Sequence, residues 1–169
     1  MKTLFLSFAL AISASILFSG CNNDDDMTQI DQEFLTAFVD GEEFVVDGSK
    51  TLLECQKMVT EFGSINLSVK VETEEGKTIE FLVFNYYGPG IYPIGNNPLN
   101  GSWMKYTEPV PEGFWSTRNN MMGSDIDFLE ITQDDGSYLS GGFSFVAFDD
   151  IGTSLRTVSD GSFKIKIDK

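Results

Sequence analysis

The residue types that carry most enzyme chemistry are scarce in this sequence. It contains no histidine and only two cysteines, Cys21 and Cys55. A Ser-His-Asp or Cys-His nucleophile therefore cannot be assembled, and neither can a zinc site built on histidine or on several thiolates. The glycine-rich phosphate loops Gly-x-Gly-x-x-Gly and Gly-x4-Gly-Lys-Ser/Thr do not occur either. The sequence predicts no catalytic residues, no metal site and no cofactor.

Paired carboxylates are the acid–base chemistry that the composition leaves open. The pairs are Glu74-Glu75, Asp134-Asp135 and Asp149-Asp150, and each lies beside turn-forming residues. We interpret all three as solvent-exposed turns. Oxygen ligands for Ca²⁺ occur at 134–137 and 24–26, but the twelve-residue spacing of an EF-hand is absent, so we predict no calcium site.

A loop-rich, aromatic segment between residues 95 and 123 is the best candidate for ligand binding. It contains Trp103, Tyr106, Trp115 and Arg118. Flat apolar rings beside polar groups suit the faces of sugars and the hot spots of protein interfaces, and loops on a rigid β-scaffold often carry binding residues. We therefore predict that these four residues bind an exposed ligand, either a glycan or a protein. The alternative is that the two tryptophans close one end of the hydrophobic core.

Cys21 lies where a signal peptide would give way to the mature chain. Lys2 supplies a positive charge, residues 4–18 are apolar or small, and Ser19 and Gly20 are small. Because the apolar run is shorter than the about 20 residues that span a bilayer, the pattern predicts a cleaved signal peptide over residues 1–20. An ordinary signal peptide followed by a chance cysteine is the alternative to a lipid attachment site.

The block Leu17-Phe18-Ser19-Gly20-Cys21 resembles the lipobox of bacterial lipoproteins. The resemblance implies that the Cys21 thiol receives a diacylglyceryl group, and two acyl chains anchor a protein stably. Residues 21–32 would then be a lipidated, acidic linker, in which the aspartates at 24–26 repel anionic headgroups. The acidic run also resembles the surface-export signal of outer-membrane lipoproteins in glycan-degrading Gram-negative bacteria. It implies a body exposed at the cell surface; a body that faces the periplasm is the alternative.

The remainder of the chain, residues 33–169, has the size of one domain. The formal net charge of −15 argues against nucleic acid, whose binding requires Lys and Arg to neutralise phosphates. The 15 phenylalanines and 16 glycines suit strands and tight turns. With Cys21 lipidated, Cys55 has no disulfide partner, and we expect it to be a small buried hydrophobe.

Apolar alternation and turn signals predict an all-β domain. Asp40-Gly41 between two apolar runs predicts a hairpin of residues 34–39 and 44–46. Residues 51–60 fit a strand or a short helix, 91–94 a short edge strand, and 155–158 lead to a turn at 159–161. The clearest further strands are expected at 64–72, 78–87, 102–107, 114–117, 124–132, 139–148 and 162–167. The pattern predicts a single antiparallel β-sandwich or barrel of about nine strands.

Four segments resemble a family of small surface lipoproteins of unknown function. They are FLTAFVDGEEFVVDG (34–48), YYGPGIYPIGN (86–96), SDIDFLEITQDDGSYLSGGFSFVAFD (124–149) and TVSDGSFKIKI (157–167). The resemblance covers most of the chain after the signal peptide and implies an all-β fold. It supplies no catalytic residues.

The sequence therefore predicts a lipid-anchored envelope protein that binds a glycan or protein ligand without catalysis, as a binding or adhesion module at the bacterial surface. The lipid on Cys21 would be its contact with the outer membrane. A structural or accessory subunit of an envelope complex is one alternative, which an exposed apolar patch or an open edge strand would favour. A carboxylate-dependent hydrolase is the other, which a deep cleft with two close acidic side chains would favour.

Overall fold

The computed structural model describes residues 32–48, 51–95, 101–120 and 127–168. The predicted signal peptide (1–20), the lipid attachment site Cys21 and the linker up to residue 31 lie outside these ranges, as do residues 124–126 at the start of one predicted strand. Within the described ranges, no helix is long and apolar enough to cross a membrane.

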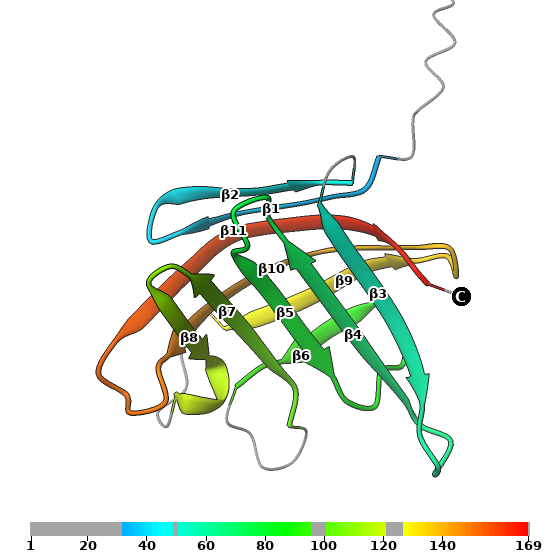
Figure 1. The fold of residues 1–169 in the computed structure, drawn as a ribbon. Coiled ribbons are helices and arrows are strands. Elements are labelled where there is room, and N and C mark those ends of the chain that lie inside the picture. Colours follow the sequence, from blue (N-terminus) through cyan, green and yellow to red (C-terminus); the bar gives the residue numbers. More distant parts are fainter. Residues whose placement is uncertain (1–31, 49–50, 96–100, 121–126, 169) are drawn as a thin grey trace, which may run out of the picture. The chain divides into compact units, whose positions relative to one another are not determined.

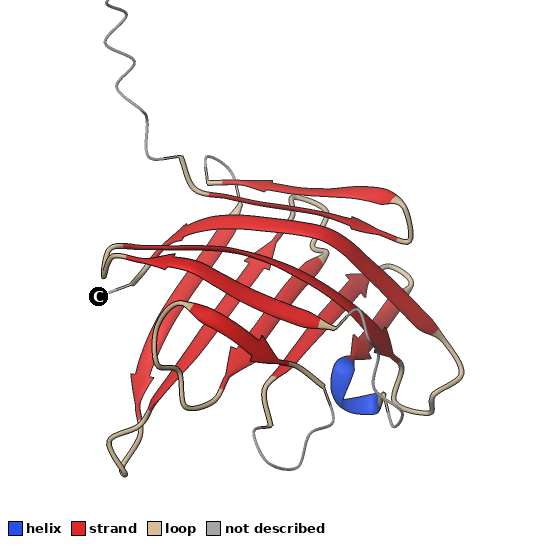
Figure 2. Ribbon diagram, turned by 180° about the vertical axis from the view of Figure 1, so that it is seen from behind, coloured by secondary structure: helices blue, strands red, loops and turns tan. Residues whose placement is uncertain are grey.

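Eleven β-strands and one short 3₁₀-helix make up the regular structure of the described residues (Figure 2). The strands are β1 (Phe34–Val39), β2 (Glu42–Asp47), β3 (Leu52–Val59), β4 (Ile65–Glu72), β5 (Thr78–Val83), β6 (Gly90–Pro93), β7 (Trp103–Pro109), β8 (Glu112–Ser116), β9 (Phe128–Asp134), β10 (Tyr138–Phe148) and β11 (Leu155–Lys166), with the helix η1 (Thr117–Asn119) after β8. The predicted all-β class is confirmed, and the segment that fitted either a strand or a helix is the strand β3.

The strands form one curled antiparallel sheet, a half-barrel. Nine strands follow the order β2-β1-β11-β10-β8-β7-β5-β4-β3, while β9 pairs with β10 and β6 pairs with β9. In Figure 1, β3, β4, β5 and β7 run side by side across the front, and β9, β10 and β11 cross behind them. The sheet branches at β10, which pairs with β11 along its length and with β9 through its first half, but meets β8 only at Phe148 and Ser116.

The core fills the concave side of the sheet because side chains alternate along each strand. In β4, for example, Leu67, Val69 and Val71 are fully buried while the residues between them are partly exposed. Phe163 of β11 is at the centre, with its ring centroid 5.6 Å from that of Phe81 and 6.2 Å from that of Phe143. Burying such a side chain contributes about 1.5–3 kcal/mol relative to leaving it exposed.

The predicted turn at 159–161 is wrong, because β11 runs through it as one long strand. Asp160 adopts a left-handed φ of 52°, and the pairing of β11 shifts register on both sides, opposite Thr36/Phe38 of β1 and Phe143/Phe145 of β10. One extra residue in a continuous strand is a β-bulge, which bends the strand and increases its twist. The bulge therefore helps the sheet to curl.

The free edge of β3 meets the C-terminal end of the chain. The Asp168 backbone N–H donates to the Cys55 carbonyl at 2.8 Å, and the Cys55 N–H donates to Asp168 Oδ2 at 3.2 Å. The first bond joins the backbone of β3 to the segment that follows β11, and the second, from the backbone to a side chain, supports it. Cys55 lies at this seam and is fully buried, as the sequence predicted.

Candidate functional site

The four predicted binding residues lie on two opposite faces of the sheet. Trp103 and Tyr106 belong to β7 and Trp115 to β8, close to the strands expected at 102–107 and 114–117, while Arg118 is in η1. Tyr106 is 1% exposed and Trp115 is 7% exposed, and their ring centroids are 5.9 Å apart. These two aromatic residues are part of the core, as the alternative interpretation expected for Trp115.

Trp103 and Arg118 come together on the outer, convex face. The Arg118 guanidinium carbon lies 5.2 Å from the Trp103 ring centroid, and Arg118 Nη2 donates to the Gly101 carbonyl at 3.3 Å. Lys105 Nζ lies 5.5 Å from the Trp103 ring and 5.8 Å from the Phe114 ring, and it forms an ion pair with Glu80. The structure thus assembles two separate pairs and does not bring all four residues into one site.

A cavity of about 280 Å³ opens beside Tyr106, at the end of the sheet where four segments converge. We call it the inner pocket. The segments are the β1–β2 hairpin, the turn between β4 and β5, the end of β7 and the start of β11. Its lining residues are Val39, Asp40, Glu42, Glu43, Phe44, Lys77, Tyr106, Glu108 and Arg156. Val39, Phe44 and Tyr106 are buried, so the pocket combines an apolar floor with charged walls and rim.

Arg156 is the central polar group of the inner pocket. Its Nη2 lies 3.4 Å from Glu108 Oε2, its Nη1 lies 3.5 Å from Asp40 Oδ2, and its Cζ lies 4.2 Å from the Trp115 ring centroid. The indole is fixed in turn, because Trp115 Nε1 donates to Ser154 Oγ at 3.0 Å. A planar guanidinium stacked on a ring and held by two carboxylates has a defined orientation.

The Tyr106 hydroxyl completes the wall by donating to Glu108 Oε1 at 2.9 Å. Burial and then the hydrogen bond to Glu108 raise the pKa of Tyr106 above its ordinary value. The hydroxyl therefore stays protonated at physiological pH. Glu108 is held through both carboxylate oxygens, one by Tyr106 and one by Arg156.

The Asp40-Gly41 hairpin places Asp40 beside Arg156. Both turn residues have left-handed φ angles, 51° and 87°, as a tight Asp-Gly turn requires. The Asp40 N–H donates to the Thr157 carbonyl at 2.9 Å, and Asp40 Oδ1 accepts from the Thr157 N–H at 2.8 Å. Because Thr157 follows Arg156 in β11, this local pairing brings the second oxygen, Oδ2, to the guanidinium. The sequence predicted the turn but not the site.

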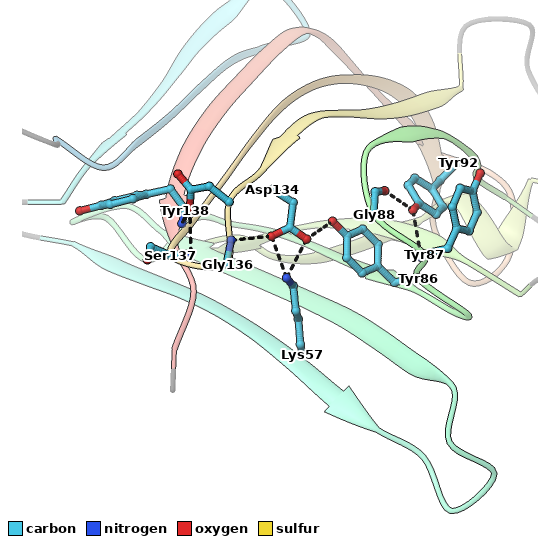
Figure 3. A network of polar contacts seen from close by, with 10 residues as sticks. Lys57, Tyr86, Tyr87, Gly88, Tyr92, Asp134, Gly136, Ser137 and Tyr138 are labelled. Atoms are coloured by element: carbon cyan, nitrogen blue, oxygen red, sulfur yellow. Dashed lines mark hydrogen bonds and ion pairs between the residues drawn. The ribbon is translucent and has the colours of Figure 1, made fainter.

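A second polar network lies at the seam beside β3 (Figure 3). Lys57 Nζ is 2.8 Å from Asp134 Oδ1 and 2.7 Å from Oδ2, and the Tyr86 hydroxyl donates to Oδ2 at 2.7 Å. We call Lys57, Tyr86 and Asp134 the clasp. The interpretation of Asp134 as part of a solvated turn is wrong, since its side chain is only 10% exposed. Its neighbour Asp135 does cap the turn, accepting from the backbone N–H groups of Ser137 and Tyr138.

The clasp is a structural network and not an acid–base pair. Burial by itself raises the pKa of Asp134, but hydrogen bonds from Lys57, Tyr86 and the Gly136 N–H outweigh that effect and hold the pKa below its ordinary value. The carboxylate is thus fixed as an anion, with both oxygens occupied by donors. Across the described ranges, no group of three or more Cys, Asp or Glu side chains could hold a metal ion.

Comparisons with protein-family models, with curated proteins and with solved structures found no match for this chain. The resemblance to small surface lipoproteins therefore stays a prediction from the sequence. The inner pocket brings six charged side chains together over an apolar floor, and it is the candidate functional site.

Proposed function

We propose that the protein is a lipid-anchored cell-envelope module that binds a glycan without catalysis, and that the inner pocket holds one sugar residue. The observation that carries this proposal is the Arg156 guanidinium held between Asp40 and Glu108 above an apolar floor. Small-molecule sites typically combine a small number of convergent polar groups with an apolar lining. A cavity of about 280 Å³ is close to the lower limit for such sites and matches one ring-sized group.

The chemistry of the pocket walls suits hydroxyl groups. A sugar hydroxyl both donates and accepts, so it can donate to a carboxylate and accept from a guanidinium or an ammonium group. Glu108, Asp40 and the rim residues Glu42 and Glu43 supply acceptors, while Arg156 and Lys77 supply donors. The rings of Phe44 and Tyr106 meet edge to face with centroids 6.4 Å apart and, at 3% and 1% exposed, close the base of the pocket.

The proposed binding test uses the full chain with Cys21→Ser, which prevents lipidation and leaves the described domain unchanged. The protein is labelled and applied to an array of neutral and acidic glycans. We expect it to bind neutral glycans, and free neutral sugar at millimolar concentration should compete. A folded protein that binds no glycan on the array would contradict the proposal.

The proposed location rests on the lipobox-like block that ends at Cys21 and on the acidic residues that follow it. Mass spectrometry of the mature protein should find Cys21 as the first residue, carrying a diacylglyceryl group. Protease added to intact cells should digest the domain if it is exposed at the outer surface of the outer membrane. Protection on intact cells, with digestion after the outer membrane is opened, would place the domain in the periplasm.

One observation favours the alternative of an accessory subunit in an envelope complex. The end of β3 and the turn that follows it expose three apolar side chains close together in the sequence, with Phe62 97% exposed, Val59 73% and Met58 43%. Exposed apolar groups that gather in one place often mark protein contacts. If this alternative holds, Phe62→Ser should release the protein from a stoichiometric envelope complex on a native gel, without changing glycan binding or thermal stability.

A further inference from the structure

A shallow groove of about 500 Å³ adjoins the inner pocket at Glu108. We call it the outer groove. It is lined by Gly76, Thr107, Glu108, Pro109, Glu112, Gly113 and Phe114. Thr107 and Phe114 are direct partners in the register of β7 and β8, so they stand side by side on the convex face.

The inner pocket and the outer groove share the lining residue Glu108 and both reach the turn between β4 and β5. That turn contributes Gly76 to the groove and the next residue, Lys77, to the pocket. A ligand that fills the pocket would extend past Glu108 to reach the convex face. The pocket itself has room for one ring, and the larger groove can take the group that follows.

Phe114 gives the outer groove a flat aromatic wall. It is 47% exposed, and it lies on the strand β8, which is paired with β7 through five residue pairs. A half-exposed ring on a paired strand is a rigid surface on which a sugar face can stack. The neighbouring position, Gly113, has no side chain, and a Cβ there would lie only 2.0 Å from Cη2 of Trp115. The packing of Trp115 thus requires glycine at Gly113.

The charges around the two cavities select against acidic ligands. Five carboxylates line them, those of Asp40, Glu42, Glu43, Glu108 and Glu112, against two basic side chains, Lys77 and Arg156. The chain as a whole carries a formal net charge of −15. A uronic-acid or sulfated glycan would be repelled both at the site and at long range, whereas neutral hydroxyl groups find many acceptors.

We infer that the inner pocket and the outer groove together bind a neutral oligosaccharide, with one sugar in the pocket and a neighbouring sugar stacked on Phe114. This inference rests on the proposed function and adds the length and the charge class of the ligand. It also assigns Phe114, which lies outside the aromatic set predicted from the sequence, as a binding residue.

The test measures how affinity depends on chain length. The full chain with Cys21→Ser is titrated calorimetrically with glucose, mannose and galactose oligomers of one to six residues, and with uronic-acid oligomers of the same lengths. For the series that binds, we expect affinity to rise at least tenfold between one residue and three, and then to level off. The Phe114→Ala variant should bind the trimer about as weakly as the monomer, with monomer binding unchanged.

Phe62→Ala is the matched control, because Phe62 is a more exposed phenylalanine that lines neither cavity. It should leave the length dependence intact. Monomer binding with no gain from longer chains, no effect of Phe114→Ala on the trimer, or equal binding of uronic-acid oligomers would overturn the inference and leave the proposed function standing. A folded protein that binds no sugar of any length would instead contradict the proposed function itself.

Discussion

Lys57 of β3 and Asp134 of β9 form a two-pronged ion pair, with Nζ 2.8 and 2.7 Å from the carboxylate oxygens, between strands that share no ladder of backbone hydrogen bonds. The Tyr86 hydroxyl joins the same carboxylate from the segment between β5 and β6. The clasp therefore holds the free edge of the half-barrel through side chains. Beside the clasp, the backbone N–H of Asp168 donates a hydrogen bond to the Cys55 carbonyl.

Removing either half of the ion pair should destabilise the fold. We expect Lys57→Met and Asp134→Asn each to lower the free energy of unfolding by about 2 kcal/mol, because each leaves a half-buried charged or polar group without its partner. In urea denaturation, the double variant should lose about 1 kcal/mol less stability than the sum of the two single-variant losses. The exposed pair Lys70 and Glu72, 4.0 Å apart, is the control and should show almost no coupling. Equal coupling in both pairs would contradict the role of the clasp.

Acid should weaken the clasp. The lowered pKa of Asp134 means that this carboxylate stabilises the folded state above the ordinary aspartate pKa of about 3.9, and that this contribution is lost as the pH falls below that value. Between pH 5 and pH 3, the urea midpoint of the unaltered protein should therefore fall more steeply than that of Asp134→Asn. Parallel curves for the two proteins would show that Asp134 is not held as an anion by its neighbours.

The Cys55 thiol should be inert in the folded protein. Burial, followed by the charge of Asp168, raises its pKa to about 12, and the thiolate is the reactive form. In a Cys21→Ser background, where Cys55 is the remaining thiol, a disulfide reagent at pH 8 should react at least about 100-fold more slowly than with the unfolded chain. Lys57→Met should speed the reaction by loosening the seam. Fast labelling without urea would show that the seam is open.

Two neighbouring glycines in β10 should differ sharply in their tolerance of alanine. A Cβ at Gly141 would lie 2.1 Å from the Glu130 carbonyl oxygen and 2.8 Å from Phe163 Cζ, whereas a Cβ at Gly142 would meet the Gly161 oxygen at 3.1 Å. Gly141→Ala should cost about 3 kcal/mol or more in thermal or urea unfolding, since the backbone of β9 cannot move away cheaply, and Gly142→Ala should cost clearly less. Similar losses at the two positions would contradict the close approach of β9 to β10.

Two Asp-Gly pairs show how far local sequence determines the fold. Asp40-Gly41 forms the predicted hairpin turn, and Asp160-Gly161 was predicted to be a turn as well. The aspartates adopt nearly the same left-handed φ, 51° and 52°, but positive φ continues only at Gly41, with 87°. Asp160 lies between two partner strands, β1 and β10, which keep the chain extended beyond it. The Asp-Gly dipeptide favours a left-handed φ at its aspartate. The pairing with distant strands then decides whether the chain forms a turn or a bulge.

The candidate site was only partly accessible to sequence reasoning. The aromatic segment was identified, and strand alternation could have shown that Trp103 and Tyr106, three residues apart, point to opposite faces. Arg156 and Asp40 could not have been found, because both come from parts of the chain far from Tyr106 and meet it only when the sheet curls. The burial of Asp134 could not be predicted for the same reason, because its partner Lys57 is 77 residues away in the sequence.

We expect Arg156 and the walls of the inner pocket to bind the sugar. Two arginines offer a matched comparison, because each lies over a tryptophan: Arg156, which lines the pocket, over the buried Trp115, and Arg118 over Trp103 on the outer face. Lysine in either place keeps the charge but loses the planar fork that two carboxylates can hold.

The most direct test is calorimetric titration of the Arg156→Lys and Arg118→Lys variants with the best glycan from the array, after thermal unfolding has shown that both are folded. We predict that Arg156→Lys weakens binding at least tenfold, and that Arg118→Lys leaves it within a factor of two. Unchanged affinity in Arg156→Lys, or a loss confined to Arg118→Lys, would contradict the assignment of the inner pocket as the binding site.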